Sequence, residues 1–107
     1  MDLPCGNWSA HDTVAQSIYY VAHAADWGTT LDIAPRRGEG YYETNPVLGT
    51  HPSRARVNTH FAVTGLLHMA ISCVLSPKYR TVWQYTTIAV EVGYASNNLK
   101  IGLNLNF

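Results

Sequence analysis

Residues 57–76 read VNTHFAVTGLLHMAISCVLS and contain no Asp, Glu, Lys or Arg. An uncharged stretch of this length matches what a helix needs to cross the hydrocarbon core of a bilayer. Pro52 suits the first turn of such a helix and Pro77 ends it, which predicts a helix over 53–76. Asn, Thr, His and Ser residues lower its hydrophobicity, so a core helix of a soluble bundle remains the alternative interpretation.

Two further helices flank this segment. Ser9 and Asp12 have the spacing of a capping box, which predicts a helix over 10–33 that Pro35 prevents from continuing. A third helix is predicted over 79–97. The connection before it is short, so the second and third helices should form an antiparallel hairpin.

The remaining segments join or follow these helices. Residues 34–52 are rich in Pro, Gly and charge and predict an ordered surface loop. Residues 99–107 alternate apolar and polar side chains, which indicates a short extended tail that packs on the helices or pairs with another subunit. The predicted fold is all-α: a single domain over 1–107, built as a three-helix, membrane-type bundle.

Composition restricts the functional classes. Charged residues make up 13% of the chain and hydrophobic residues 47%, a shortage of charge that indicates a non-aqueous environment. Seven basic and seven acidic residues cancel, so no specific nucleic-acid binding is expected. Cys5 and Cys73 show no spacing of a disulfide framework or zinc site, and we expect two free thiols.

Each predicted helix carries one line of polar side chains. The members that could form a cluster are His23, Asp26, Thr30, His60, Thr64, His68, Gln84 and Glu91. In lipid, charged side chains are costly, so these lines should turn inward and meet. A proton or metal site is one interpretation. Hydrogen bonds that fix helix register are the preferred one, because no zinc-binding His motif is present; we expect no bound metal.

Other chemical motifs are missing from the sequence. No nucleophile elbow surrounds a Ser or Cys, and Gly38-Glu39-Gly40 is too short to hold a phosphate. We therefore expect no catalytic activity and no cofactor. The most distinctive segment of the 34–52 loop is a candidate interaction surface, through Tyr41, Tyr42, Glu43, Asn45 and Pro46.

Two short elements of the sequence carry a resemblance to other proteins. Asp26-Trp27-Gly28-Thr29-Thr30 forms a D-x-x-T-T element, and Glu43 to Gly49 forms an E-x-N-P-x-x-G element followed by His51-Pro52-Ser53. This pattern resembles uncharacterised small helical membrane proteins of bacteria and their phages, over about 30 positions and the three-helix layout. The resemblance implies a multi-helix integral membrane protein of a bacterium or a phage, and no particular activity.

Three functional hypotheses follow. The first is a small integral or membrane-associated protein whose partners are the lipid bilayer and other copies of itself, or other membrane proteins, with the first loop and C-terminus in the cytoplasm. The second is a phage virion or DNA-ejection component that assembles into a ring or channel in the host envelope. The third is a soluble helical binding module that uses the 41–53 loop.

Overall fold

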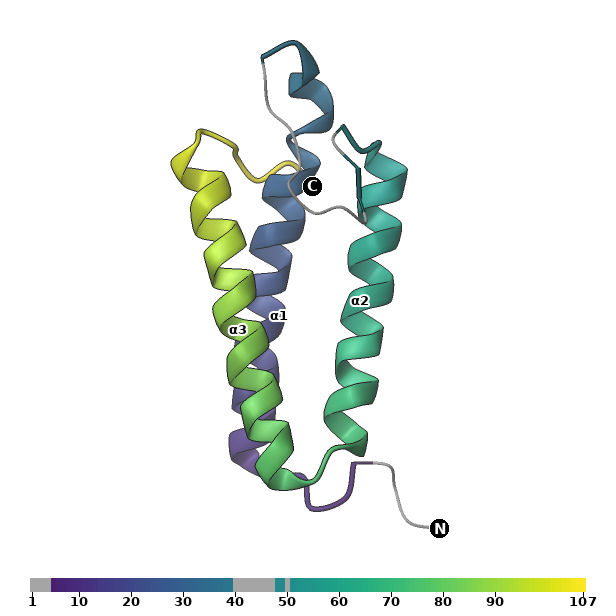
Figure 1. Cartoon of the computed structure of the whole chain (residues 1–107), viewed down its shortest axis with the longest axis vertical. Coiled ribbons are helices and arrows are strands. Elements are labelled where there is room, and N and C mark those ends of the chain that lie inside the picture. The colour runs from purple at the N-terminus through teal and green to yellow at the C-terminus, as the bar shows by residue number, and fades with distance from the viewer. Residues whose placement is uncertain (1–4, 40–47, 50) are drawn as a thin grey trace.

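The computed structural model describes residues 5–39, 48–49 and 51–107, with the side chains of 37–39 left out. Over these residues the protein is all-helical and forms a three-helix bundle (Figure 1). Helix α1 spans Ala10–Leu31, α2 spans Arg54–Val74 and α3 spans Pro77–Lys100. A short 3-10 helix, η1, covers Ala34–Glu39 within the predicted loop.

Local signals set the starts of the helices. Ser9 and Asp12 form the predicted capping box, in which each side chain accepts a hydrogen bond from the backbone N–H of the other. The Ser53 side chain caps α2, so this helix starts at Arg54. Pro77 occupies the first turn of α3, where its missing N–H costs nothing. The third helix is therefore longer at both ends than the predicted 79–97.

A glycine ends α3. Gly102 has a φ of 102°, and its N–H donates to Leu99 while the N–H of Leu103 donates to Asn98. These two bonds form a Schellman motif, which favours glycine because a side chain is strained at positive φ. The chain reverses there, and the buried Leu103 side chain begins a tail that crosses back over α1.

Helices α1 and α3 run side by side in the same direction, and α2 runs antiparallel to both (Figure 1). The bundle therefore has two ends. One end holds the N-terminal segment, the start of α1 and the α2–α3 connection. The other holds η1, the start of α2 and the C-terminal tail.

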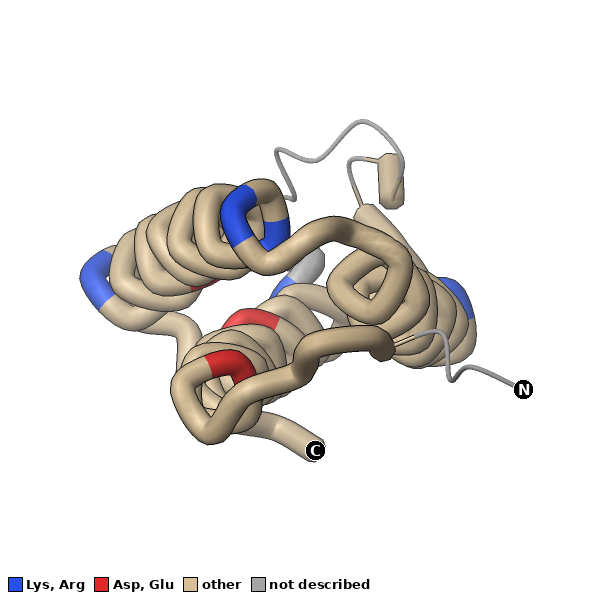
Figure 2. The backbone as a smooth tube through the Cα atoms, turned by 90° about the horizontal axis from the view of Figure 1, so that it is seen from below, with Lys and Arg blue, Asp and Glu red and all other residues tan. Residues whose placement is uncertain are grey.

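The bundle is inverted relative to a water-soluble protein, because many polar side chains lie inside it and many apolar side chains lie on its surface. Among the described residues, twelve polar or charged ones are buried, including Asp12, Arg80 and Gln84, whereas ten hydrophobic ones are buried. Large apolar side chains instead cover the outside, with Val21 of α1 72% exposed and Leu66 of α2 74% exposed. Figure 2 shows that the Lys and Arg residues lie at the helix ends. Charge is therefore found inside the bundle and at its ends, and the middle of its outer surface is apolar.

The cysteines correct a prediction. Cys5 and Cys73 form a disulfide between the N-terminal segment and the last turn of α2, where we expected free thiols. The prediction was wrong because the two residues are 68 positions apart in sequence. Their proximity depends on the antiparallel placement of α1 and α2, which spacing alone does not reveal.

Among the described residues, one helix is long and apolar enough to cross a membrane. That helix is α2, Arg54–Val74.

Candidate functional site

A column of buried polar side chains runs along the inside of the bundle, and we call it the polar core. It is built from α1, α2 and α3 in three groups: Arg80 with its partners near the α2–α3 connection, the Gln84, His68 and Glu91 region in the middle, and Asp26 with Asn98 toward the other end. Each group joins at least two helices.

Arg80 organises the first group. Its fully buried guanidinium donates from Nη1 to the Asp12 carboxylate at 2.8 Å and from Nε to the Ser72 carbonyl at 2.6 Å. Nη2 donates to the carbonyls of Gly6 and Leu75, each at 3.0 Å. One side chain thus ties the N-terminal segment and α1 to the end of α2. A planar guanidinium group can join several parts of the chain in this way because it presents five hydrogen-bond donors in fixed directions.

A directional chain of hydrogen bonds fills the middle. Gln84 Nε2 donates to the Asp12 carbonyl at 3.1 Å, which only accepts, and to Gln16 Oε1 at 3.2 Å. Gln16 must then donate through Nε2 to Nδ1 of His68, 3.0 Å away. His68 consequently carries its proton on Nε2, which lies 2.7 Å from Thr87 Oγ1. This series of hydrogen bonds therefore holds His68 as the neutral imidazole.

His23 differs from His68 in the partner of its Nδ1, which is a carboxylate. Its Nε2 lies 2.8 Å from the carbonyl of Phe61, which only accepts, so Nε2 donates. Its Nδ1 lies 2.9 Å from a carboxylate oxygen of Glu91 and 3.2 Å from the Tyr19 hydroxyl. The contact between His23 and Glu91 requires a proton on one of the two groups. The His23 and Glu91 side chains therefore hold one proton between them.

Aromatic rings connect the two histidines. The Tyr19 ring stacks on His68 at a centroid distance of 3.4 Å and on His23 at 5.2 Å. Trp83 stacks on the other face of His68 at 4.9 Å, and its Nε1 donates to Ser72. The stack fixes both imidazole rings in position and places the Tyr19 ring against both the neutral His68 and His23 of the His23–Glu91 pair.

The third group joins the far ends of α1 and α3. Asn98 donates from Nδ2 to Thr29 Oγ1 at 2.9 Å and to Asp26 Oδ1 at 3.3 Å, and Thr30 donates to the same carboxylate oxygen. Asp26 is thereby held by groups from both helices. This contact supplies the polar partners that a buried carboxylate requires.

The C-terminal tail is fixed by Asp32, at the end of α1. Its carboxylate accepts from the Asn104 backbone and the Asn106 side chain and pairs with Arg36 at 2.8 Å. Gly28 lies under the tail, and a Cβ there would come within 2.6 Å of the Phe107 ring. The tail thus packs on α1, one of the two arrangements expected from its alternating pattern.

The structure gathers most of the polar residues singled out from the sequence. His23 meets Glu91, His68 joins Gln84 through Gln16, and Asp26 meets Thr30. The loop candidates Tyr41, Tyr42, Glu43, Asn45 and Pro46 lie outside the described residues.

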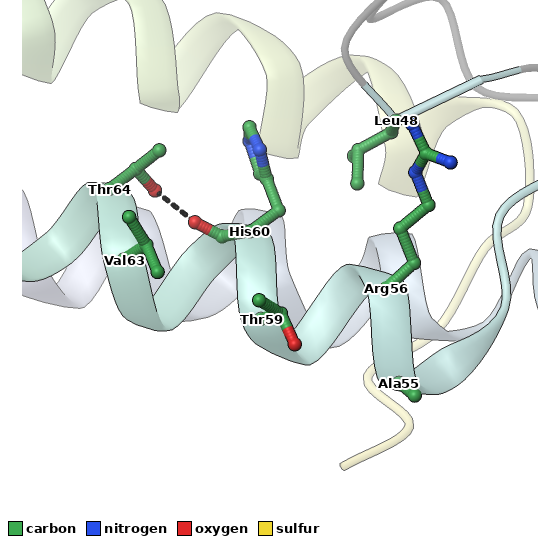
Figure 3. Close-up of a pocket in the computed structure, with 7 residues that line it drawn as sticks. All are labelled: Leu48, Ala55, Arg56, Thr59, His60, Val63 and Thr64. Carbon is green, nitrogen blue, oxygen red and sulfur yellow. Dashed lines mark hydrogen bonds between the residues drawn. The ribbon is translucent and has the colours of Figure 1, made fainter.

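His60 and Thr64 do not join the polar core. They line an open groove of about 650 Å³ near the start of α2, together with Leu48 and Arg56 (Figure 3). Thr64 donates to the carbonyl of His60, a bond within α2. We predicted that they would join His68 because the three residues follow one another at steps of four along α2. In the structure His60 and Thr64 face the groove instead.

Sequence reasoning missed Asp12, Gln16 and Tyr19 as members of the polar core. The capping box already accounted for Asp12, so no contact with another helix was expected for it. Gln16 and Tyr19 lie within an uncharged stretch of α1 and were not singled out. Their spacing of three and four residues from one another, continued by His23, was the available signal.

The described residues contain no group of three or more His, Cys, Asp or Glu side chains that could hold a metal ion. The arrangement can hold a proton between His23 and Glu91, and its hydrogen bonds fix the register between the helices. No protein-family model, curated protein or solved structure matches this chain. The fold and site define it as a three-helix bundle with a polar core and an apolar surface.

Proposed function

We propose that this chain is an integral membrane protein in which all three helices cross the bilayer, and that it acts through helix packing and self-association. The observation that carries the proposal is the location of charge. Among the described residues, the exposed Lys and Arg are Arg54, Arg56, Lys78 and Lys100, all at helix ends. A water-soluble bundle would place its charges along the outside instead.

The low average hydrophobicity of α1 and α3 does not oppose this proposal. Both helices carry acidic or basic residues in their sequence, but Asp12, Asp26 and Arg80 are buried and Glu91 is paired with His23. An average over the whole helix counts these inward side chains, whereas lipid meets only the outward ones. At 1.5 Å per residue, α1 and α3 are about 33 and 36 Å long, enough to span a hydrocarbon core.

Self-association is supported by a surface of α3. Ala89 and Gly93 lie four residues apart on its exposed side, and a Cβ at Gly93 would meet no atom within 4 Å. Small residues at this spacing let helices approach closely in lipid, where packing drives association. The surface is slightly hollowed, with Tyr94 and Asn97 at its border.

Membrane insertion is tested by fractionation. The protein expressed in bacteria should stay in the membrane pellet after an alkaline carbonate wash and should require detergent for extraction. Recovery as a stable monomer without detergent would contradict the proposal and favour the soluble binding module.

Self-association is tested separately with Gly93→Ile. The added side chain should block close approach and reduce the mass measured by light scattering in detergent. Ala70→Ile adds similar bulk to an exposed position on α2 and should leave the mass unchanged. A monomeric wild-type protein, or equal masses for both variants, would exclude association through α3.

A further inference from the structure

A cavity of about 250 Å³ lies beside the middle of the polar core and is lined by all three helices. Its outer border is apolar, formed by the exposed side chains of Leu67, Ile71 and Val90. Its inner wall contains the buried Tyr19 and His68 rings. The volume equals that of about eight water molecules, which is room for a small ring or a short chain.

Nearly all polar groups around this cavity already have partners within the bundle. His68 is bonded at both ring nitrogens, Thr87 donates to the Trp83 carbonyl, and Thr64 donates to His60. Their hydrogen-bonding capacity is therefore committed to holding the helices together. A ligand that needs a donor from these groups would have to break the polar core.

Glu91 is the exception among the lining residues. One carboxylate oxygen contacts His23 at 2.9 Å, and the described residues offer no partner to the other oxygen. The side chain is 14% exposed and lies at the cavity wall. A carboxylate oxygen that has no partner in the described part of the chain and lies at the wall of a cavity favours a ligand that donates a hydrogen bond, and most of all one that also carries positive charge.

We propose that this cavity binds a small organic ammonium ion, with its charged nitrogen at Glu91 and its apolar part between Leu67, Ile71 and Val90. The stacked rings of Trp83, His68 and Tyr19 add an aromatic surface beside the ammonium. A ligand that can only accept hydrogen bonds, whether an anion or a neutral molecule, finds no free donor among the lining residues, because the donors around the cavity are committed to partners within the bundle. This inference does not depend on membrane insertion, because the cavity lies within one chain.

The probe is benzylammonium, compared with benzyl alcohol and benzoate, which keep the ring and change the charge. Isothermal titration of the purified protein, in detergent if it needs detergent, should show one benzylammonium bound per chain. Its affinity should exceed that of benzyl alcohol about tenfold or more, the factor expected for a hydrogen bond to a charged group. Benzoate should not bind.

Three variants, one of them a control, distinguish the role of the carboxylate from that of the cavity. Glu91→Gln keeps the shape of the side chain and should lower benzylammonium affinity to that of benzyl alcohol. Asp32→Asn removes a carboxylate at the far end of α1 and should leave binding unchanged. Leu67→Trp fills the border at an exposed position and should remove binding of both molecules while Glu91 is intact.

Three results would overturn the inference: equal affinity for the ammonium and the alcohol, unchanged binding in Glu91→Gln, or unchanged binding in Leu67→Trp. Circular dichroism of each variant identifies any that fail to fold. If Glu91→Gln does not fold, the comparison of the three probes and the Leu67→Trp result still decide the question. Fractionation gives an independent answer on membrane insertion.

Discussion

Arg80 connects more parts of the protein than any other side chain described above. It contacts the N-terminal segment, Asp12 of α1 and the last turn of α2, and its guanidinium lies 4.8 Å from the Trp8 ring. Because it is fully buried, removing its charge leaves the Asp12 carboxylate without its principal partner. Breaking a buried ion pair from one side is strongly destabilising.

Arg80→Met should therefore lower the free energy of unfolding by about 3–5 kcal/mol. Lys78→Met makes the same kind of change at an exposed position two residues away, and should change it by less than about 0.5 kcal/mol. Thermal unfolding followed by circular dichroism, in one detergent for all proteins, measures both. Equal stability of the two variants would show that the ion pair contributes little.

The residue scale also shows where sequence reasoning succeeds. The lines of polar side chains on each helix were visible from spacing; His23, His68 and Gln84 are buried, and Glu91 is half-buried beside them. Their main partners were not visible, because the contacts of His23 with Glu91, and of Gln16 with His68 and Gln84, join residues more than 50 positions apart. Helix spacing predicts which face a residue occupies, but not the register between helices.

At the scale of elements, the disulfide links the N-terminal segment to α2. It closes a loop of 68 residues, and restricting the unfolded chain over that length stabilises the fold by about 4 kcal/mol in the chain-entropy account. Cys5→Ser should lower the free energy of unfolding by this order. Dithiothreitol should do the same to the wild-type protein and should have no effect on Cys5→Ser. Unchanged wild-type stability after reduction would contradict the link.

The helices themselves were predictable because their ends carry local signals. Ser9, Pro35 and Pro77 act within one or two turns, so their effect can be inferred without knowing the fold. The C-terminal tail was less certain because alternation indicates an extended chain but not what it packs on. Its position depends on Asp32 and Gly28, which lie more than 70 residues earlier.

At the scale of the whole molecule, the two ends differ in chemistry. Arg54, Arg56 and Lys100 lie at the end that holds the C-terminal tail, whereas Lys78 is the exposed basic residue at the disulfide end among the described residues. Basic residues favour the cytoplasmic side, and disulfides form in oxidising compartments. If the protein inserts in the membrane as proposed, both observations predict that its C-terminus lies in the cytoplasm.

Reporter fusions test this orientation. Green fluorescent protein fused after Phe107 should fluoresce, and alkaline phosphatase at the same position should be inactive because its disulfides do not form in the cytoplasm. The same reporters fused after Leu75, at the disulfide end, should give the reverse pattern. An active phosphatase after Phe107 would show that the orientation is inverted.

The most direct test of the inverted bundle is the environment of its outward side chains. A spin label at Leu66 or Val82 should collide with oxygen dissolved in lipid and be protected from a water-soluble nickel complex when the protein is reconstituted in vesicles. A label at Arg54, at a helix end, should show the opposite preference. Strong collisions of the nickel complex at Leu66 and Val82 would mean that water surrounds the helices, and would contradict the account.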